Sequence, residues 1–350
     1  MSNGPNRILD EFAKLLTDAA GAAQGVRREV ETAFKAQAEK VMNSMDVVQR
    51  EEFEAMRDMA VVMPAPFAGG GALPGKFVDG SYANEAGSRD YKLYVPSSYT
   101  GEPVPLLVML HGCTQDPEDF ANGTGMNALA EEMAFLVLYP AQSKQANPSR
   151  CWNWFNEIDQ QHGQGEPSII AGMTNAVMAR HAVDAGQVYV AGLSAGGAMA
   201  TIMGTLYPEL YAAVGVHSGL PFASANDLSS ALAAMKGEFR RSQAPGSALP
   251  IIVFHGDQDT TVHPSNGEEL VAQMARGLPR RPAVEPGRVP DGHAYTRTVH
   301  RHHDGTVHAE HWVVHGAGHA WFGGNALGSY TDGRGPDASR EMLRFFRTRR

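Results

Sequence analysis

The chain has 350 residues, of which 43% are hydrophobic and 19% charged, a composition that suits a globular protein with one large core and an appendage. No apolar run reaches the roughly 18 residues that a membrane-spanning helix requires, so the sequence predicts no transmembrane helix. The formal net charge of -9 offers no basic surface to a phosphate backbone, which excludes nucleic acid as an expected partner.

Residues 1–60 are predicted to form one or two amphipathic helices. Their apolar residues recur at helical spacing, and no proline follows Pro5 until Pro64. Residues 61–76 are rich in proline and glycine, which is typical of a linker. Charged residues such as Asp10 interrupt the apolar core that a secretory signal needs, which favours a cytoplasmic location.

Residues 77–350 alternate short β-rich runs with helical stretches. This order predicts an α/β domain with a mostly parallel sheet covered by helices on both faces. The predicted central strands are Leu106–Leu110, Phe135–Tyr139, Val188–Ala191, Ala213–His217 and Ile251–His255. The predicted helices are Ile169–Ala182, Gly196–Leu206, Gly267–Ala275 and Glu341–Phe346.

The segment Gly192–Gly197 (GLSAGG) follows one predicted strand directly and precedes a predicted helix directly. This is the G-x-S-x-G pattern in the context that it requires, a sharp strand-to-helix turn whose glycines avoid collisions with neighbouring elements. Such a turn lifts the serine hydroxyl above the sheet. The pattern therefore predicts an α/β-hydrolase with Ser194 as its nucleophile.

A serine hydroxyl needs a base to take its proton, and the base needs an acid to hold its tautomer. On this fold the chain order is Ser, then Asp or Glu, then His. A predicted strand enters a loop that holds Asp257 and Asp259; spacing does not choose between them, and the other is expected to bond its own turn backbone. Among fourteen histidines, His319 occupies the glycine-rich loop where the fold delivers its base, and His315 and His263 are weaker candidates.

The tetrahedral intermediate of acyl transfer needs two preorganised backbone donors. One is expected to be the amide of Ala195, directly after the nucleophile. The other is expected in the loop after the strand Leu106–Leu110, where the chain turns at Gly112, and we choose the amide of Cys113. The only other cysteine is Cys151, so the sequence allows at most one disulfide.

Three tryptophans near these motifs are candidates for substrate contact, because flat aromatic faces bind apolar chains and rings. Trp152 and Trp154 lie beside Cys151, and Trp321 is two residues beyond His319. The alternative for each indole is a position in the core.

A histidine-rich run near the C-terminus invites a zinc site, since imidazole is a common zinc ligand. However, Asp304-Gly305 is a hairpin signal, so we expect these side chains on a solvent-facing hairpin. Serine–histidine–aspartate chemistry needs neither a metal nor a cofactor. The residues concerned are His300, His302, His303, His308 and His311.

From about Phe77 to His319 the chain resembles the polyhydroxybutyrate depolymerase family of esterases, which includes relatives that act on feruloyl and acetyl esters. The resemblance is carried by YKLYVP at 91–96, HGCTQ at 111–115, RCWNWF at 150–155, GLSAGG at 192–197 and GHAW at 318–321. It implies a carboxylic ester hydrolase acting through an acyl-enzyme. The leading substrate is a hydroxyalkanoate polyester or oligoester, and feruloyl or acetylxylan esters are the alternatives.

The same resemblance implies particular roles for residues of this chain. It selects Asp259 as the acid, and it suggests a disulfide between Cys113 and Cys151. Its relatives are often secreted, whereas the start of this chain favours the cytoplasm, so the compartment stays open. The implied catalytic set is Ser194 as nucleophile, Asp259 as acid, His319 as base, and the amides of Cys113 and Ala195 as the oxyanion hole.

Residues 1–60 resemble a different family, the membrane fusogenic protein-like accessory factors of ubiquinone biosynthesis. The evidence is NRILD at 6–10, GAAQGVR at 21–27, MDVV at 45–48 and REEF at 50–53. This resemblance implies coiled-coil self-association or peripheral lipid contact. Eight basic and eleven acidic side chains give the segment a net charge of -3, which opposes attachment to anionic lipid. The alternative of another class is an interaction protein whose hydrolase domain is secondary.

Overall fold

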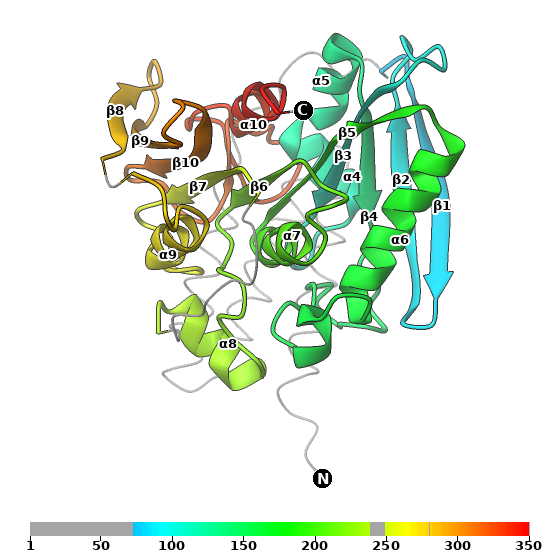
Figure 1. Ribbon diagram of the computed structural model, residues 1–350, viewed down its shortest axis with the longest axis horizontal. Coiled ribbons are helices and arrows are strands. Elements are labelled where there is room, and N and C mark those ends of the chain that lie inside the picture. Colours follow the sequence, from blue (N-terminus) through cyan, green and yellow to red (C-terminus); the bar gives the residue numbers. More distant parts are fainter. Residues whose placement is uncertain (1–72, 239–248, 280, 350) are drawn as a thin grey trace, which may run out of the picture. The chain divides into compact units, whose positions relative to one another are not determined.

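The computed structural model describes residues 73–238, 249–279 and 281–349 (Figure 1). The predicted helical arm at 1–60, and the linker up to residue 72, lie outside the described residues. Within the described ranges, no helix has both the length and the hydropathy needed to cross a bilayer.

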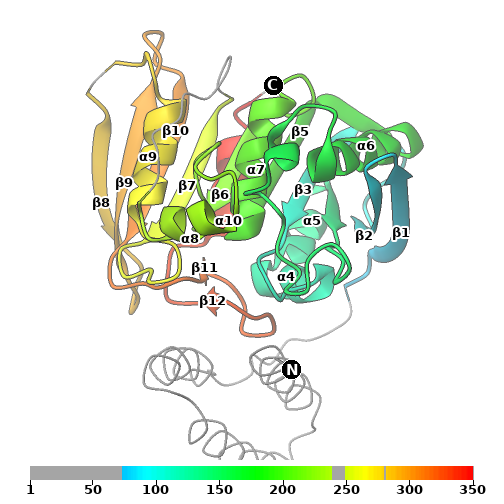
Figure 2. The same cartoon turned by 90° about the horizontal axis from the view of Figure 1, so that it is seen from below.

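In the described part of the chain, ten strands form one sheet in the order β1-β2-β4-β3-β5-β6-β7-β10-β9-β8 (Figure 1). The central parallel strands are β4 (Leu136–Pro140), β3 (Val104–Leu110), β5 (Val183–Leu193), β6 (Ala213–His217), β7 (Ile251–Gly256) and β10 (Val307–Val314). Antiparallel strands complete the edges: β1 (Lys76–Asn84), β2 (Gly87–Val95), β9 (Ala294–Arg301) and β8 (Ala283–Arg288). A small separate sheet pairs β11 (Trp321–Phe322) with β12 (Thr331–Asp332), and α4 lies at the same end of the main sheet (Figure 2).

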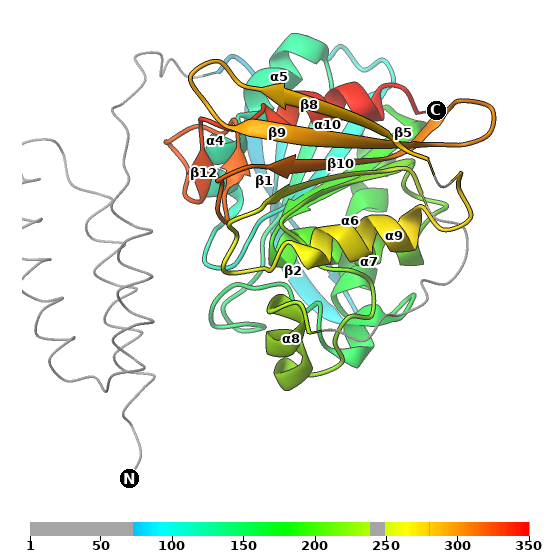
Figure 3. The same ribbon diagram turned by 90° about the vertical axis from the view of Figure 1, so that its left-hand side faces the viewer.

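Helices cover both faces of the main sheet (Figures 1 and 3). One face carries α6 (Gly165–Arg180), α7 (Ala195–Leu206) and α9 (Ser265–Met274), and the other carries α4 (Pro117–Thr124), α5 (Met126–Met133) and α10 (Ala338–Phe346). The remaining helices are α8 (Leu228–Met235) and the short 3-10 helix η1 (Glu157–Gln160). Each face has its own buried apolar cluster, which is why strands such as β4, β6 and β7 are buried along their whole length.

These elements confirm the predicted α/β fold. Every central strand and helix expected from the sequence overlaps an observed one. The strand order reverses at β3, because the chain next forms β4 on one side of it and then β5 on the other. Ligands of open α/β sheets bind beyond the carboxyl ends of the strands at such a reversal. Leu110 pairs with Gly192 and Leu193 pairs with His217, so β3, β5 and β6 end at the same edge.

Candidate active site

Ser194 occupies the turn between β5 and α7 with an unfavourable backbone conformation. Its φ of 56° and ψ of -119° lie outside the regions that a side chain favours, at a cost of about 1–3 kcal/mol. A Cβ at Gly196 would collide with the carbonyl oxygen of Leu110, and one at Gly192 would collide with the backbone of Gly196. The turn is therefore as tight as the sequence pattern requires, and Ser194 remains partly exposed while Ala195 is buried.

His319 and Asp259 form a buried pair. His319 Nδ1 lies 2.7 Å from Asp259 Oδ2, and the two side chains are 6% and 0% exposed. The other carboxylate oxygen accepts hydrogen bonds from the amides of Thr261 at 2.9 Å and Val262 at 2.8 Å. Because a carboxylate can only accept, Nδ1 donates this hydrogen bond, which leaves Nε2 as the ring nitrogen that can act as a base.

The charge on Asp259 is stabilised by its neighbours. Burial alone would raise the pKa of this carboxyl group, but hydrogen bonds from His255 and His319 hold the pKa well below its usual range. His255 is itself buried; its Nε2 lies 3.4 Å from Asp259 Oδ2 and 2.8 Å from the carbonyl oxygen of Val262. Asp259 is therefore ionised at neutral pH, as an acceptor that orients a histidine must be.

Asp257 forms a second pair, with His315. Its Oδ2 lies 2.9 Å from His315 Nδ1, and its Oδ1 accepts a hydrogen bond from the Gly316 amide at 2.7 Å. We expected whichever of the two aspartates was not the acid to bond its own turn backbone. That expectation is wrong for Asp257, because the loop that follows β10 lies against this turn and supplies the donors. The weaker candidate His263 instead contacts the Ser265 hydroxyl at 2.8 Å, at the start of α9.

His217, at the end of β6, connects the nucleophile turn with the segment that carries His319. Its carbonyl oxygen accepts a hydrogen bond from the Ser194 amide at 2.9 Å, and its Nε2 accepts one from the Phe322 amide at 3.1 Å. Burial, with the nearby rings of His255 and His319, holds the pKa of His217 well below its usual value. Sequence analysis did not predict this link, which ties the turn of Ser194 and the segment after His319 to the same strand end.

The loop after β3 leaves one amide free, and the nucleophile turn leaves another. Gly112 N–H donates to Gln115 Oε1 at 2.9 Å, and Thr114 N–H donates to a carbonyl oxygen at 2.7 Å. Between them, the Cys113 amide has no partner within the described chain, and neither does the Ala195 amide, which begins α7. Gln115, to which the sequence assigned no role, thus leaves Cys113 as the available donor of its loop.

A disulfide joins the loop after β3 to the segment before η1. The Sγ atoms of Cys113 and Cys151 are 2.02 Å apart, and the bridge spans 38 positions of the chain. By the chain-entropy relation, closing a loop of this length stabilises the fold by about 4 kcal/mol. The bridge therefore restrains the residue that carries one of the two free amides.

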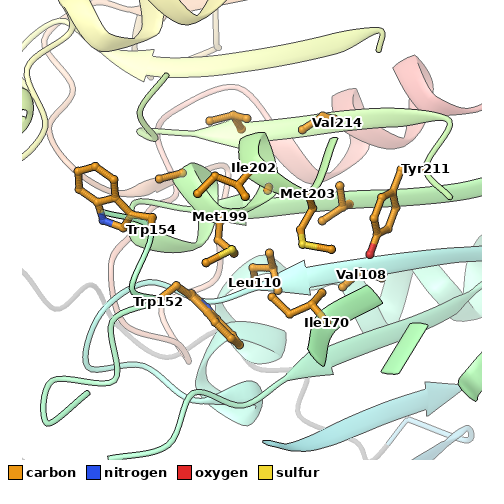
Figure 4. Close-up of a cluster of buried hydrophobic side chains, with 14 of the residues drawn as sticks. Val108, Leu110, Trp152, Trp154, Ile170, Met199, Ile202, Met203, Tyr211 and Val214 are labelled. Atoms are coloured by element: carbon orange, nitrogen blue, oxygen red, sulfur yellow. The ribbon is translucent and has the colours of Figure 1, made fainter. Parts of the chain in front are cut away.

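The three tryptophans considered for substrate contact are buried in the core. Trp152 is 0%, Trp154 6% and Trp321 1% exposed. Figure 4 shows the first two in a cluster of buried apolar side chains that includes Met199 and Ile202. Trp321 lies in the cluster on the opposite face and donates from Nε1 to Ser339 Oγ at 3.0 Å. The prediction of substrate contact is wrong for these indoles, because their rings are buried in the two apolar clusters of the core.

The histidine-rich run does form a hairpin, since β9 and β10 pair on either side of Asp304-Gly305. The expectation that its histidines face solvent is wrong for His308 and His311, which are 6% and 8% exposed. Helix α9 covers this face of β10, and His308 Nε2 lies 3.0 Å from the carbonyl oxygen of Met274. Among the described residues, no three or more histidine, cysteine or acidic side chains are grouped so as to hold a metal ion.

The doubly covered parallel sheet and the strained serine between β5 and α7 define the fold as that of an α/β-hydrolase. Residues 89–279 match the family model described as Esterase PHB depolymerase, and the chain belongs to this family. Residues 3–63 match a second model, described as Membrane fusogenic activity.

Known proteins are similar to the chain in sequence and in fold. Poly(3-hydroxyalkanoate) depolymerase C of Paucimonas lemoignei is 32% identical over 254 residues, which span 68% of this chain and 60% of that protein. Feruloyl esterase B of Thermothelomyces thermophilus is 30% identical over 205 residues, which span 53% of this chain and 69% of that protein. The structure of an acetyl xylan esterase from Aspergillus awamori is similar in fold, with a TM-score of 0.60 at 22% identity over 74% of this chain and 93% of that one.

Proposed function

We propose that the protein is a serine esterase that hydrolyses carboxylic esters through an acyl-enzyme. The observation that carries the proposal is the Asp259–His319 hydrogen bond at the edge of the sheet where Ser194 sits in its strained turn. His319 Nε2 takes the hydroxyl proton while Ser194 Oγ attacks the ester carbonyl. The amides of Cys113 and Ala195 stabilise the resulting oxyanion.

The second half of the reaction uses the same groups. Collapse of the tetrahedral intermediate breaks the ester bond, and His319 gives its proton to the departing alcohol. Water then attacks the acyl-enzyme as His319 removes its proton, and the acid leaves while the proton returns to Ser194. Asp259 stays ionised throughout and stabilises the imidazolium that forms in each half.

A hydroxyalkanoate ester, polymeric or oligomeric, is the leading substrate. The support is the family membership and the similarity to a poly(3-hydroxyalkanoate) depolymerase over 68% of this chain. Feruloyl and acetylxylan esters are the second candidate, favoured by the similarity to feruloyl esterase B and to enzymes described as probable acetylxylan esterase A.

Side-by-side assays can separate these substrates. We expect product release from polyhydroxybutyrate and its soluble oligomers, with a higher kcat/KM on the oligomers than on methyl ferulate or on acetylated xylan fragments. Faster turnover of either plant-wall ester would refute the hydroxyalkanoate assignment but leave the esterase intact. No turnover of any of them, nor of a short-chain nitrophenyl ester, would refute the esterase itself.

For residues 1–60 we propose a separate role in self-association or in contact with a lipid surface, supported by the match of residues 3–63 to the membrane fusogenic model. Deleting residues 1–60 is expected to leave ester turnover nearly unchanged, because the proposed catalytic residues all belong to the domain that follows the linker in the chain. Sedimentation and liposome flotation should then show smaller assemblies or weaker vesicle binding. Loss of turnover on deletion would contradict two independent modules.

A further inference from the structure

Tyr330 lies between the two segments that supply the proposed oxyanion hole and base. Its hydroxyl is 3.1 Å from Thr114 Oγ1, and Thr114 directly follows Cys113. Its carbonyl oxygen accepts a hydrogen bond from the amide of Trp321, two residues beyond His319, at 2.7 Å. Tyr330 directly precedes β12, which pairs with β11 at this end of the sheet (Figure 2). Its side chain therefore stands next to the proposed site without being one of its reacting groups.

Both partners of this contact have a strained backbone and are open to solvent. Thr114 has a φ of 67° and Tyr330 a φ of 52°, in a region that β-branched and bulky residues rarely adopt. Tyr330 is 38% exposed, and Thr114 is also exposed. Strain of this kind persists where the surrounding structure enforces it, and it is concentrated at functional sites. Packing into the core does not explain it here, because neither side chain is buried.

The proton of each hydroxyl can be assigned from its neighbours. Thr114 Oγ1 donates to the carbonyl oxygen of Cys113 at 2.6 Å, which uses the only proton that a threonine hydroxyl has. The contact with Tyr330 must then be donated by the phenol. The phenol oxygen is left with free lone pairs and no proton to offer. Among the described residues no donor bonds to it, so a ligand that binds there must supply one.

We propose that Tyr330 determines specificity by accepting a hydrogen bond from a hydroxyl group on the acyl part of the bound ester. A hydroxyacyl group with a free hydroxyl, such as the unit at the hydroxyl end of a hydroxyalkanoate chain, supplies this donor and a plain acyl group does not, so the contact selects esters of such hydroxyacyl groups. This assignment rests on the proposed esterase function and adds to it a chemical basis for choosing the substrate. Tyr330 is exposed where a substrate can reach it, unlike the buried tryptophans.

The test compares ethyl 3-hydroxybutyrate with ethyl butyrate, two esters that differ by the hydroxyl, using pH-stat assays of the full chain. We expect the ratio of their kcat/KM values to favour the hydroxylated ester in the wild type. Tyr330→Phe keeps the ring and removes the acceptor, so it should lower this ratio roughly three- to tenfold, the range for one neutral hydrogen bond. The loss should lie mainly in KM for the hydroxylated ester, as expected for a contact made before and during reaction.

Tyr82→Phe serves as the matched control. Tyr82 is a partly buried tyrosine on the edge strand β1, packed against α6 at Gly172, and its replacement should leave the ratio unchanged. Thermal unfolding of each variant checks that the fold is retained. An unchanged ratio in Tyr330→Phe, with both esters cleaved by the wild type, would overturn the assignment and leave the esterase standing. A wild type that cleaves neither ester would overturn both.

Discussion

Replacing Ser194 with alanine is expected to lower kcat for ester hydrolysis by about 10⁶, the loss found when a serine hydrolase loses its nucleophile. The acyl-enzyme cannot form without the hydroxyl, and only binding and the oxyanion donors remain to assist water. The alanine keeps the strained turn, where φ is 56°, so folding should be retained. Hydrolysis of a short-chain nitrophenyl ester, followed with the thermal unfolding temperature, measures both effects.

Ser218 provides the control for this substitution. It follows β6 at the same edge of the sheet, also has a left-handed backbone with a φ of 48°, and is buried. Its hydroxyl bonds to His217 at 3.2 Å rather than to the proposed base. Ser218→Ala should therefore retain most of the activity. If Ser218→Ala were inactive and Ser194→Ala active, the nucleophile would have been assigned to the wrong strand end.

Asp259→Asn is expected to lower kcat by about 10⁴, as in the corresponding change in a serine protease. An asparagine amide can donate to His319 Nδ1, which moves the ring proton to Nε2 and removes the lone pair that accepts the serine proton. The unfolding temperature should change little by comparison, since the side-chain oxygen of asparagine still accepts from the amides of Thr261 and Val262.

Asp257→Asn is the matched variant, because Asp257 lies two residues away and also bonds a histidine. It fastens the loop before His319 but does not contact His319, so it should cost no more than about tenfold in kcat, the scale of one or two lost hydrogen bonds. Equal losses in the two variants would show that the loop as a whole, and not the orientation of His319 by Asp259, sustains activity. A greater loss in Asp257→Asn would reverse the choice of acid.

The central sheet could be predicted because its strands are buried on both faces. A strand such as β4 is then a continuous apolar run that is buried along its whole length. The edge strands carry no such signal. β8 is exposed along nearly all of its length and includes Pro286, and β1 alternates between exposed and half-buried positions. Their pairing depends on neighbours in space, which the local sequence does not encode.

The residues of the site also differ in how far the sequence could predict them. Ser194 and His319 could be placed because a turn pattern and the chain order of the fold restrict them. Spacing did not show which of Asp257 and Asp259 is the acid, because the two differ only in which hydrogen-bond donors lie beside each carboxylate in the folded chain. The contact between Thr114 and Tyr330 joins residues 216 positions apart, and neither local sequence predicts it.

The tryptophans show that a residue's position in the sequence does not by itself predict substrate contact. Trp152 follows Cys151 in a motif beside the site, yet its ring lies in the core among apolar side chains that include Leu110 and Met199 (Figure 4). Proximity along the chain fixes where a backbone runs but not which way a side chain turns. The direction of a side chain depends on which neighbours it packs against, and the sequence near the residue does not identify those neighbours.

The most direct test of the proposed nucleophile is to treat the folded protein with a fluorophosphonate and to locate the adduct by peptide mass spectrometry. Such reagents attach covalently to an activated serine. We predict one adduct, on the peptide that contains Ser194, formed rapidly in the wild type and far more slowly in His319→Ala. An adduct on a different residue, or no adduct in a protein that still hydrolyses esters, would contradict the mechanism.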